Sequence, residues 1–150
     1  VMRYVGITFR GGTNPNFNNL EPWVTKNSYA QAGLYGQCTW FAWGRFYELY
    51  GYDPGFSGDG SSCVKELVAA HPDKFEQSSS PKAGAVFSAI GHNHVGIVIT
   101  VKENTITVQE GNLDGITNTF QDAKKDWQTK SYTLDQLRSI YGGVVFANPK

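Results

Sequence analysis

Residues 36–42 read Gly-Gln-Cys-Thr-Trp-Phe-Ala and open the segment that decides the fold. A glycine turn leads directly into Cys38, and the residues from there to Tyr50 are helix formers without an interior proline. Gly51 then supplies a stop. Aromatic residues recur along this stretch at steps of three and four, and charges are scarce. We therefore predict a helix over residues 38–50 that the rest of the domain encloses.

Two shorter helices flank it. A helical turn is predicted over residues 27–35, with Asn27 or Ser28 as its N-cap. A second helix is predicted over residues 63–70, after a glycine-rich turn and before Pro72. Residues 1–27 are rich in turn formers and are interpreted as an irregular arm with one strand at residues 4–9. We expect one domain overall, with residues 28–150 forming its catalytic part.

From Ala83 onward the hydrophobic period changes to two, which predicts strands. Val95, Ile97, Ile99 and Val101 are expected on one face of a strand, and further strands are expected at residues 85–87, 105–112 and 144–146. Helices followed by an antiparallel meander indicate an α+β fold.

Composition excludes several classes of protein. The 150 residues suit one domain that buries about 70 % of its unfolded surface. Thirteen basic and thirteen acidic side chains give no net charge, so no nucleic-acid partner is expected. Apolar runs are far shorter than the ~20 residues that cross a bilayer, and residues 1–4 do not resemble a signal peptide. The two cysteines are treated as separate thiols.

Cys38 is a candidate nucleophile because it begins a helix. Free amides and the positive end of the helix dipole favour a thiolate there, and the same amides can hold an oxyanion. A helix start alone is weak evidence, since free cysteine is commonly buried.

His94 strengthens the interpretation, because it begins a strand and offers a base on a rigid element. If residues 102–104 form a three-residue loop, Val101 faces Thr105, His94 faces Asn112, and Glu110 shares the sheet face of His94. Either Glu110 or Asn112 could then orient the imidazole. A two-residue loop would place them on opposite faces.

Four blocks of sequence resemble the CHAP domains, which are cysteine- and histidine-dependent amidohydrolases or peptidases of papain-like topology that cut bacterial peptidoglycan. The blocks are residues 36–42, 81–86, 94–98 and 106–112, in the family's order, within a similarity over about residues 28–148. The resemblance implies an α+β, papain-like fold with N-terminal helices packed on an antiparallel β-sheet.

The resemblance also assigns roles to residues. Cys38 corresponds to the nucleophile, His94 to the base, and Glu110 with Asn112 to the groups that hold the base. Gln37 is a candidate for the oxyanion site. Three further residues are candidates for contacts with substrate: Trp40, His92 and Trp127.

Metal chemistry is not expected. Residues 28–34, just before the nucleophile, contain no carboxylate, whereas some family members carry an aspartate-rich calcium loop there. A zinc site of His92, His94, Glu110 and Cys38 is the alternative, but compact ligand spacing is missing. Cys63 has no matching histidine and is expected to pack in the core.

The predicted function is hydrolysis of an amide bond in the peptide part of peptidoglycan through an acyl-thioester on Cys38, without a cofactor. An endopeptidase is favoured over an N-acetylmuramoyl-L-alanine amidase. We expect a monomer, secreted or phage-delivered, that acts on the cell wall beside other domains of a longer chain. The alternative is a non-catalytic glycan-binding module that uses aromatic platforms such as Trp23 and Trp127.

Overall fold

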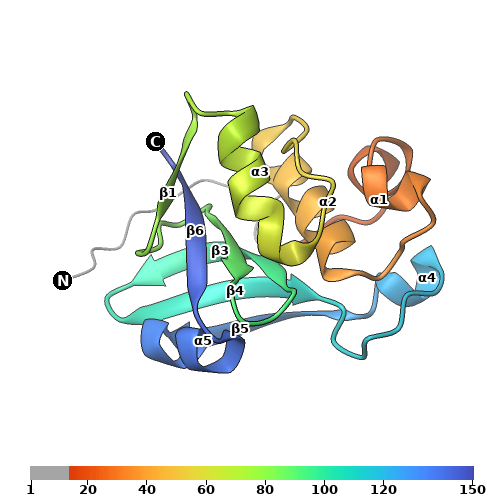
Figure 1. The fold of residues 1–150 in the computed structure, drawn as a ribbon. Helices are drawn as coiled ribbons and strands as arrows, with labels where there is room; N and C mark the ends of the chain where they lie inside the picture. The colour runs from red at the N-terminus through yellow and green to blue at the C-terminus, as the bar shows by residue number, and fades with distance from the viewer. Residues whose placement is uncertain (1–13) are drawn as a thin grey trace.

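Six strands form one antiparallel sheet in the computed structural model, which describes residues 14–150 (Figure 1). Their order across the sheet is β1-β6-β2-β3-β4-β5. The strands are β1 (Phe75–Ser78), β2 (Val86–Ala89), β3 (Val95–Lys102), β4 (Thr105–Gly111), β5 (Trp127–Thr133) and β6 (Val144–Pro149). The predicted α+β class is confirmed.

Helices cover both faces of the sheet. On one face, α2 lies against β3 and β4, and α3 against β1, β2 and β6; on the other, α5 packs near β5 and β6 (Figure 1). The helices are α1 (Ser28–Gln31), α2 (Cys38–Tyr50), α3 (Cys63–Ala70), α4 (Phe120–Ala123) and α5 (Leu134–Tyr141), with short helical turns η1 (Glu21–Thr25) and η2 (Gly60–Ser62). No helix within residues 14–150 has the length and apolarity to span a membrane.

The central helix α2 spans the predicted residues. It begins after Gln37, whose backbone is extended, and ends at Gly51, whose φ of 81° is the left-handed conformation that glycine adopts without strain. Its side chains are buried nearly all round, including Arg45, which forms an ion pair with Glu48 at 2.9 Å. This enclosure explains why the helix is aromatic and almost uncharged.

The larger hydrophobic core lies between the sheet and helices α2 and α3. The smaller one lies beneath α5 and contains Val98, Val108 and Leu137. The sequence pattern does not predict β1, β5, α4 or α5. β5 is the outer strand of the sheet and its residues are mostly polar, so its sequence lacks the hydrophobic alternation of the inner strands.

The hairpin between β3 and β4 has the predicted register near Ile97, but its turn and its first strand differ from the expected ones. Lys102 pairs with Thr105, so the loop has two residues and the condition of a three-residue loop is not met. A β-bulge between Val98 and Thr100 adds one residue to β3, after which Ile97 pairs with Gln109 as predicted. Because the bulge reverses the alternation, Val101 lies on the opposite face from Ile97, contrary to the prediction.

The described part of the predicted arm, residues 14–27, is packed into the domain. Trp23 is fully buried, and the buried Asn27 side chain donates to the carbonyls of Pro22 and Trp40 while capping α1 at Tyr29. These contacts anchor the segment to α2, so residues 14–27 are not an irregular extension. The strand predicted at residues 4–9 lies outside the described residues.

Candidate active site

Cys38 is the first residue of α2 and is 8 % exposed. Gln37 precedes it as N-cap, but its side chain does not cap the helix; instead its Oε1 accepts a hydrogen bond from Thr39 Oγ1 at 3.1 Å. The Gln37 side chain therefore leaves the first amides of α2 unoccupied next to the thiol, where they can stabilise negative charge.

Two glycines allow the backbone to close tightly around this site. Gly36 has a φ of 83°, and a Cβ there would lie 3.1 Å from the carbonyl oxygen of Ile116. A Cβ on Gly60 would lie 2.7 Å from the carbonyl carbon of His94. The turn before Cys38 and the loop before α3 thus contact, respectively, the loop after β4 and the backbone of His94.

His94 is held on one ring nitrogen by a carboxylate. Its Nε2 lies 2.9 Å from Glu110 Oε1, and the ring of Tyr141 stacks on the imidazole with centroids 4.7 Å apart. The side chain of Cys38 also interacts with the imidazole. Because Nε2 is engaged by Glu110, Nδ1 is the nitrogen left for the thiol.

Glu110 is itself fixed by several donors. Its side chain is 1 % exposed. Oε1 accepts from the Tyr141 hydroxyl, and Oε2 accepts from Gln128 Nε2 at 3.2 Å and from the Tyr132 hydroxyl at 3.4 Å. A buried carboxylate needs such partners, and here β5 and α5 supply them. These three donors could not be predicted from the sequence, since no motif marks them.

Electrostatics couples the three groups. Burial lowers the pKa of His94, but hydrogen bonds and charge attraction from Cys38 and Glu110 outweigh it and raise that pKa to about 9. Burial raises the pKa of Glu110, but hydrogen bonds from His94 and Tyr141 outweigh it and hold that pKa below its ordinary value. Burial and the neighbouring Glu110 carboxylate raise the pKa of Tyr132 to about 12, so its hydroxyl remains a donor. The arrangement favours an imidazolium at His94 beside an ionised Glu110 carboxylate.

Asn112 contributes in a different way. It has a φ of 64°, and its N–H donates to the carbonyl of Asp126 at 3.0 Å. Its Oδ1 is buried and has no hydrogen-bond partner within residues 14–150. Of the two residues predicted to orient the ring, Glu110 is the one on Nε2, whereas Asn112 lines the pocket beside Cys38.

The pocket at Cys38 has a volume of about 380 Å³. Its walls are Gln37 and Thr39 at the helix start, residues 58–60, Asn93, and Asn112, Gly115 and Thr117 of the loop after β4. The lining is polar, which suits a peptide backbone with its many donors and acceptors. We call this space the cysteine pocket.

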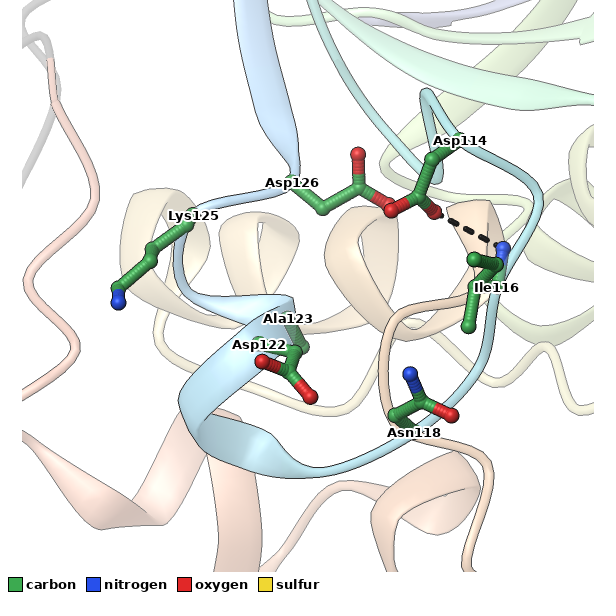
Figure 2. A pocket seen from close by; sticks show the side chains of 7 residues that line it. All are labelled: Asp114, Ile116, Asn118, Asp122, Ala123, Lys125 and Asp126. Atoms are coloured by element: carbon green, nitrogen blue, oxygen red, sulfur yellow. Dashed lines mark hydrogen bonds between the residues drawn. The ribbon is translucent and has the colours of Figure 1, made fainter.

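A second hollow, of about 320 Å³, is lined in part by residues of the same loop after β4 (Figure 2). There the carboxylates of Asp114 and Asp126 lie side by side, and Asp114 Oδ1 accepts from the Ile116 N–H at 2.8 Å. Asp126 Oδ1 accepts from the Leu113 N–H at 2.9 Å. Burial and the neighbouring Asp114 raise the pKa of Asp126. These bonds fix the loop that forms one wall of the cysteine pocket.

Residues 14–150 contain no group of three or more His, Cys, Asp or Glu side chains arranged to bind a metal ion. The alternative zinc site of His92, His94, Glu110 and Cys38 therefore lacks support from the donor geometry. The structure supplies a hydrogen-bonded pair, His94 and Glu110, in place of a ligand cluster.

The predicted aromatic contacts divide into two groups. Trp40 is 1 % exposed, so it belongs to the core, contrary to the prediction of a substrate contact; fully buried Trp23 is likewise no platform. Trp127 is partly exposed and stacks on Phe41, with centroids 5.8 Å apart. His92 is exposed near Tyr141, 6.3 Å between ring centroids. Trp127 and His92 remain predicted contacts.

Cys63 is fully buried in the larger core, in agreement with a packing role. Its thiol donates to the carbonyl of Asp59 at 3.3 Å. Burial raises the pKa of the Cys63 thiol, which opposes formation of a thiolate.

Comparison with known protein families identifies the family of this chain. The family model described as CHAP domain matches residues 24–112, a stretch that includes Cys38, His94, Glu110 and Asn112. The chain therefore belongs to the CHAP domain family. Comparison with the curated proteins gave no significant match.

Two solved structures share the fold. One is an N-acetylmuramoyl-L-alanine amidase from Staphylococcus aureus, with a TM-score of 0.51 and 20 % identity over 77 % of this chain and 31 % of that one. The other is Ly7917 with the hydrolysis product of MDP, with a TM-score of 0.50 and 17 % identity over 88 % of this chain and 60 % of that one. The present chain thus spans less than two thirds of either protein.

Proposed function

We propose that this chain is a cysteine-dependent peptidoglycan hydrolase with Cys38 as nucleophile, His94 as proton carrier and Glu110 as the residue that holds His94. One observation carries the proposal: Cys38, at a helix start, and Glu110 both interact with the His94 ring, beside a polar pocket. Membership of the CHAP domain family supports the same chemistry.

The reaction has two halves. The Cys38 thiolate attacks the carbonyl carbon of the amide, and the first amides of α2 stabilise the oxyanion, with Gln37 beside them. The His94 imidazolium gives its proton to the leaving nitrogen, the C–N bond breaks, and an acyl-thioester remains on Cys38. His94 then takes a proton from water, the hydroxide attacks the thioester, and the acid product leaves the regenerated thiolate.

Within this class we propose an endopeptidase that acts in the peptide part of the wall. The amidase named above supports the competing assignment, a cut between the sugar and the first alanine. The products distinguish them. Mass spectrometry of fragments from defined cell walls, with labelling of new amino termini, should find new termini within the peptide, whereas an amidase frees the alanine terminus.

We also propose that the chain works outside the producing cell, secreted or delivered by a phage, beside other domains that bring it to the wall. The similar structures are longer chains, which supports this arrangement. A glycan-binding module is less well supported, because its candidate platform Trp23 is buried, as is the candidate substrate contact Trp40.

Replacement of each cysteine tests the nucleophile. Cys38→Ala should abolish wall clearing and leave adherence to the wall unchanged, while Cys63→Ser should still clear walls. Clearing by Cys38→Ala at the wild-type rate would reject the proposed function, and loss of activity in Cys63→Ser with a folded protein would reject the choice of nucleophile.

A further inference from the structure

The charged residue that lines the cysteine pocket is Asp59. Apart from the nucleophile Cys38, the other lining residues have no ionisable side chain: Gln37, Thr39, Asn93, Asn112, Thr117 and glycines. The Asp59 carboxylate adds a negative charge to the pocket, although the whole chain carries no net charge.

The Asp59 carboxylate is exposed and has neither a hydrogen-bond donor nor an ion-pair partner within residues 14–150. Its backbone, in contrast, is tied down. The Asp59 carbonyl accepts from the Ser62 N–H at 3.0 Å and from Cys63 Sγ at 3.3 Å. The side chain is therefore available to a ligand on a backbone that does not have to be ordered first.

The loop around Asp59 is fixed by buried and half-buried groups. Glu66 Oε1 accepts from the N–H groups of Ser57 and Gly58, both at 3.1 Å, and Glu66 Oε2 accepts from Ser62 Oγ at 2.6 Å. The Glu66 carboxylate is thus occupied within the loop, whereas Asp59, which lines the pocket, has a carboxylate without a partner in residues 14–150.

Further contacts join this loop to the catalytic elements. The Tyr29 hydroxyl donates to the Gly58 carbonyl at 2.8 Å, and the buried Ser88 hydroxyl donates to the Gly60 carbonyl at 2.7 Å. Asn93 Oδ1 accepts from the Ser61 N–H at 3.1 Å, next to His94 in the sequence. The position of Asp59 relative to the thiol and imidazole is therefore set by the fold.

We propose that Asp59 binds an ammonium group of the peptide substrate close to the amide that is cut, and so selects cationic over anionic peptides. This inference rests on the proposed function. The ligand class is an amine-bearing peptide, and the amine is either the side-chain amine of a diamino acid or a free amino terminus. Both are protonated at neutral pH and complement a solvent-exposed carboxylate.

The effect should be moderate, because Asp59 is exposed and water screens its charge. A three- to tenfold preference, about that of a good exposed ion pair, is expected. It should appear mainly in kcat/KM at low salt and decline as salt rises.

The first experiment uses purified peptidoglycan, untreated or with its free amines acetylated. The wild type should cleave untreated wall three- to tenfold faster, and Asp59→Asn should lose that preference. Asp73→Asn, an exposed aspartate outside the pocket, is the matched control and should keep the preference. Equal rates on both walls for the wild type, or an equal loss on both walls in Asp59→Asn, would overturn the proposal.

A second measurement does not depend on catalysis. In a Cys63→Ser background, Cys38 is modified with ammonium-bearing, neutral and sulfonate-bearing methanethiosulfonates. The rate ratio of cationic to anionic reagent should fall several-fold in Asp59→Asn, with the neutral reagent as reference for thiolate content. An unchanged ratio would reject the ammonium site. A wild type that cleaves neither wall but shows the expected ratio would reject the proposed function alone.

Two synthetic stem peptides containing lysine identify the source of the amine. One is acetylated on its amino terminus and the other on its side chain, and each is tested for protecting Cys38 against iodoacetamide. The form with the recognised amine should protect the wild type better than Asp59→Asn. Protection by neither form, or equal protection in both proteins, would contradict the proposal.

Discussion

The ring of Tyr141 lies nearly parallel to the ring of His94, with centroids 4.7 Å apart and planes inclined by 17°, while its hydroxyl donates to Glu110. One side chain at the end of α5 thus contacts both members of the His–Glu pair. Stacking restricts rotation of the imidazole, and the hydroxyl stabilises the carboxylate that holds it. Tyr141 is therefore a positioning residue.

Tyr141→Phe should keep the stacked ring and lose only the hydrogen bond to Glu110. We expect kcat to fall about three- to tenfold, the range for one hydrogen bond. With one donor fewer, the carboxylate attracts the imidazolium more strongly, so the alkaline limb of the kcat/KM profile should move to higher pH. Tyr141→Ala should cost more, because stacking is also lost. An unchanged pH profile and kcat in Tyr141→Phe would argue against positioning.

Glu110→Gln should lower kcat by about 100-fold, as expected when a base loses its orienting partner. Loss of the carboxylate charge should also lower the pKa of His94, so the alkaline limb moves to lower pH, opposite to Tyr141→Phe. The comparison variant is Asn112→Ala, which removes a pocket side chain without touching Nε2. Both variants should lose more activity than thermal stability, and a melting temperature that falls in parallel with activity would contradict this.

Stability should depend on pH through the same pair. The pKa of His94 is raised from 6.5 to about 9, so its stabilising contribution is complete below about pH 6.5 and is lost as pH rises through 9. The pKa of Glu110 is lowered, so its contribution is present above its ordinary value and is lost in acid. Melting temperatures of the wild type should therefore decline between pH 6.5 and 9 more steeply than those of His94→Ala. Parallel curves would show that the His94 titration is not linked to folding.

Treatment with EDTA should leave activity intact. The proposed steps use a thiolate and an imidazole, and residues 28–34 offer calcium no carboxylate. The measurement is wall clearing before and after chelation, with a zinc-dependent hydrolase as control. Activity that returns only on addition of calcium or zinc would contradict the metal-free mechanism.

The sequence predicts those site residues that stand in a recognisable motif or a regular strand pattern. The helix Cys38–Tyr50 could be predicted residue by residue, because glycines mark both of its ends. The relation between His94 and Glu110 could be predicted from strand register and resemblance. The three donors to Glu110 could not, since Gln128, Tyr132 and Tyr141 come from a polar outer strand and a short helix that carry no motif.

Other differences between the predicted and the observed site arise from tertiary packing, which the local sequence does not reveal. Trp23 and Trp40 stand in sequences that fit either core or platform, and their burial follows from packing against each other, with ring centroids 5.1 Å apart. Asp59 could not be predicted, because a glycine-rich turn with one carboxylate is an ordinary surface loop. Its significance comes from the neighbouring thiol, which only the fold brings near.

The bulge in β3 has an evolutionary consequence. Because the turn at residues 103–104 is one residue shorter than the predicted loop and the bulge adds one residue, the two compensate along the same hairpin. Insertion of a residue at the turn, or deletion of one at the bulge, should separately turn the His94 side chain away from Glu110. Both changes together should restore the pair. Relatives are thus free to exchange a short turn with a bulge for a longer turn without one, but only by passing through an inactive intermediate or by making both changes at once.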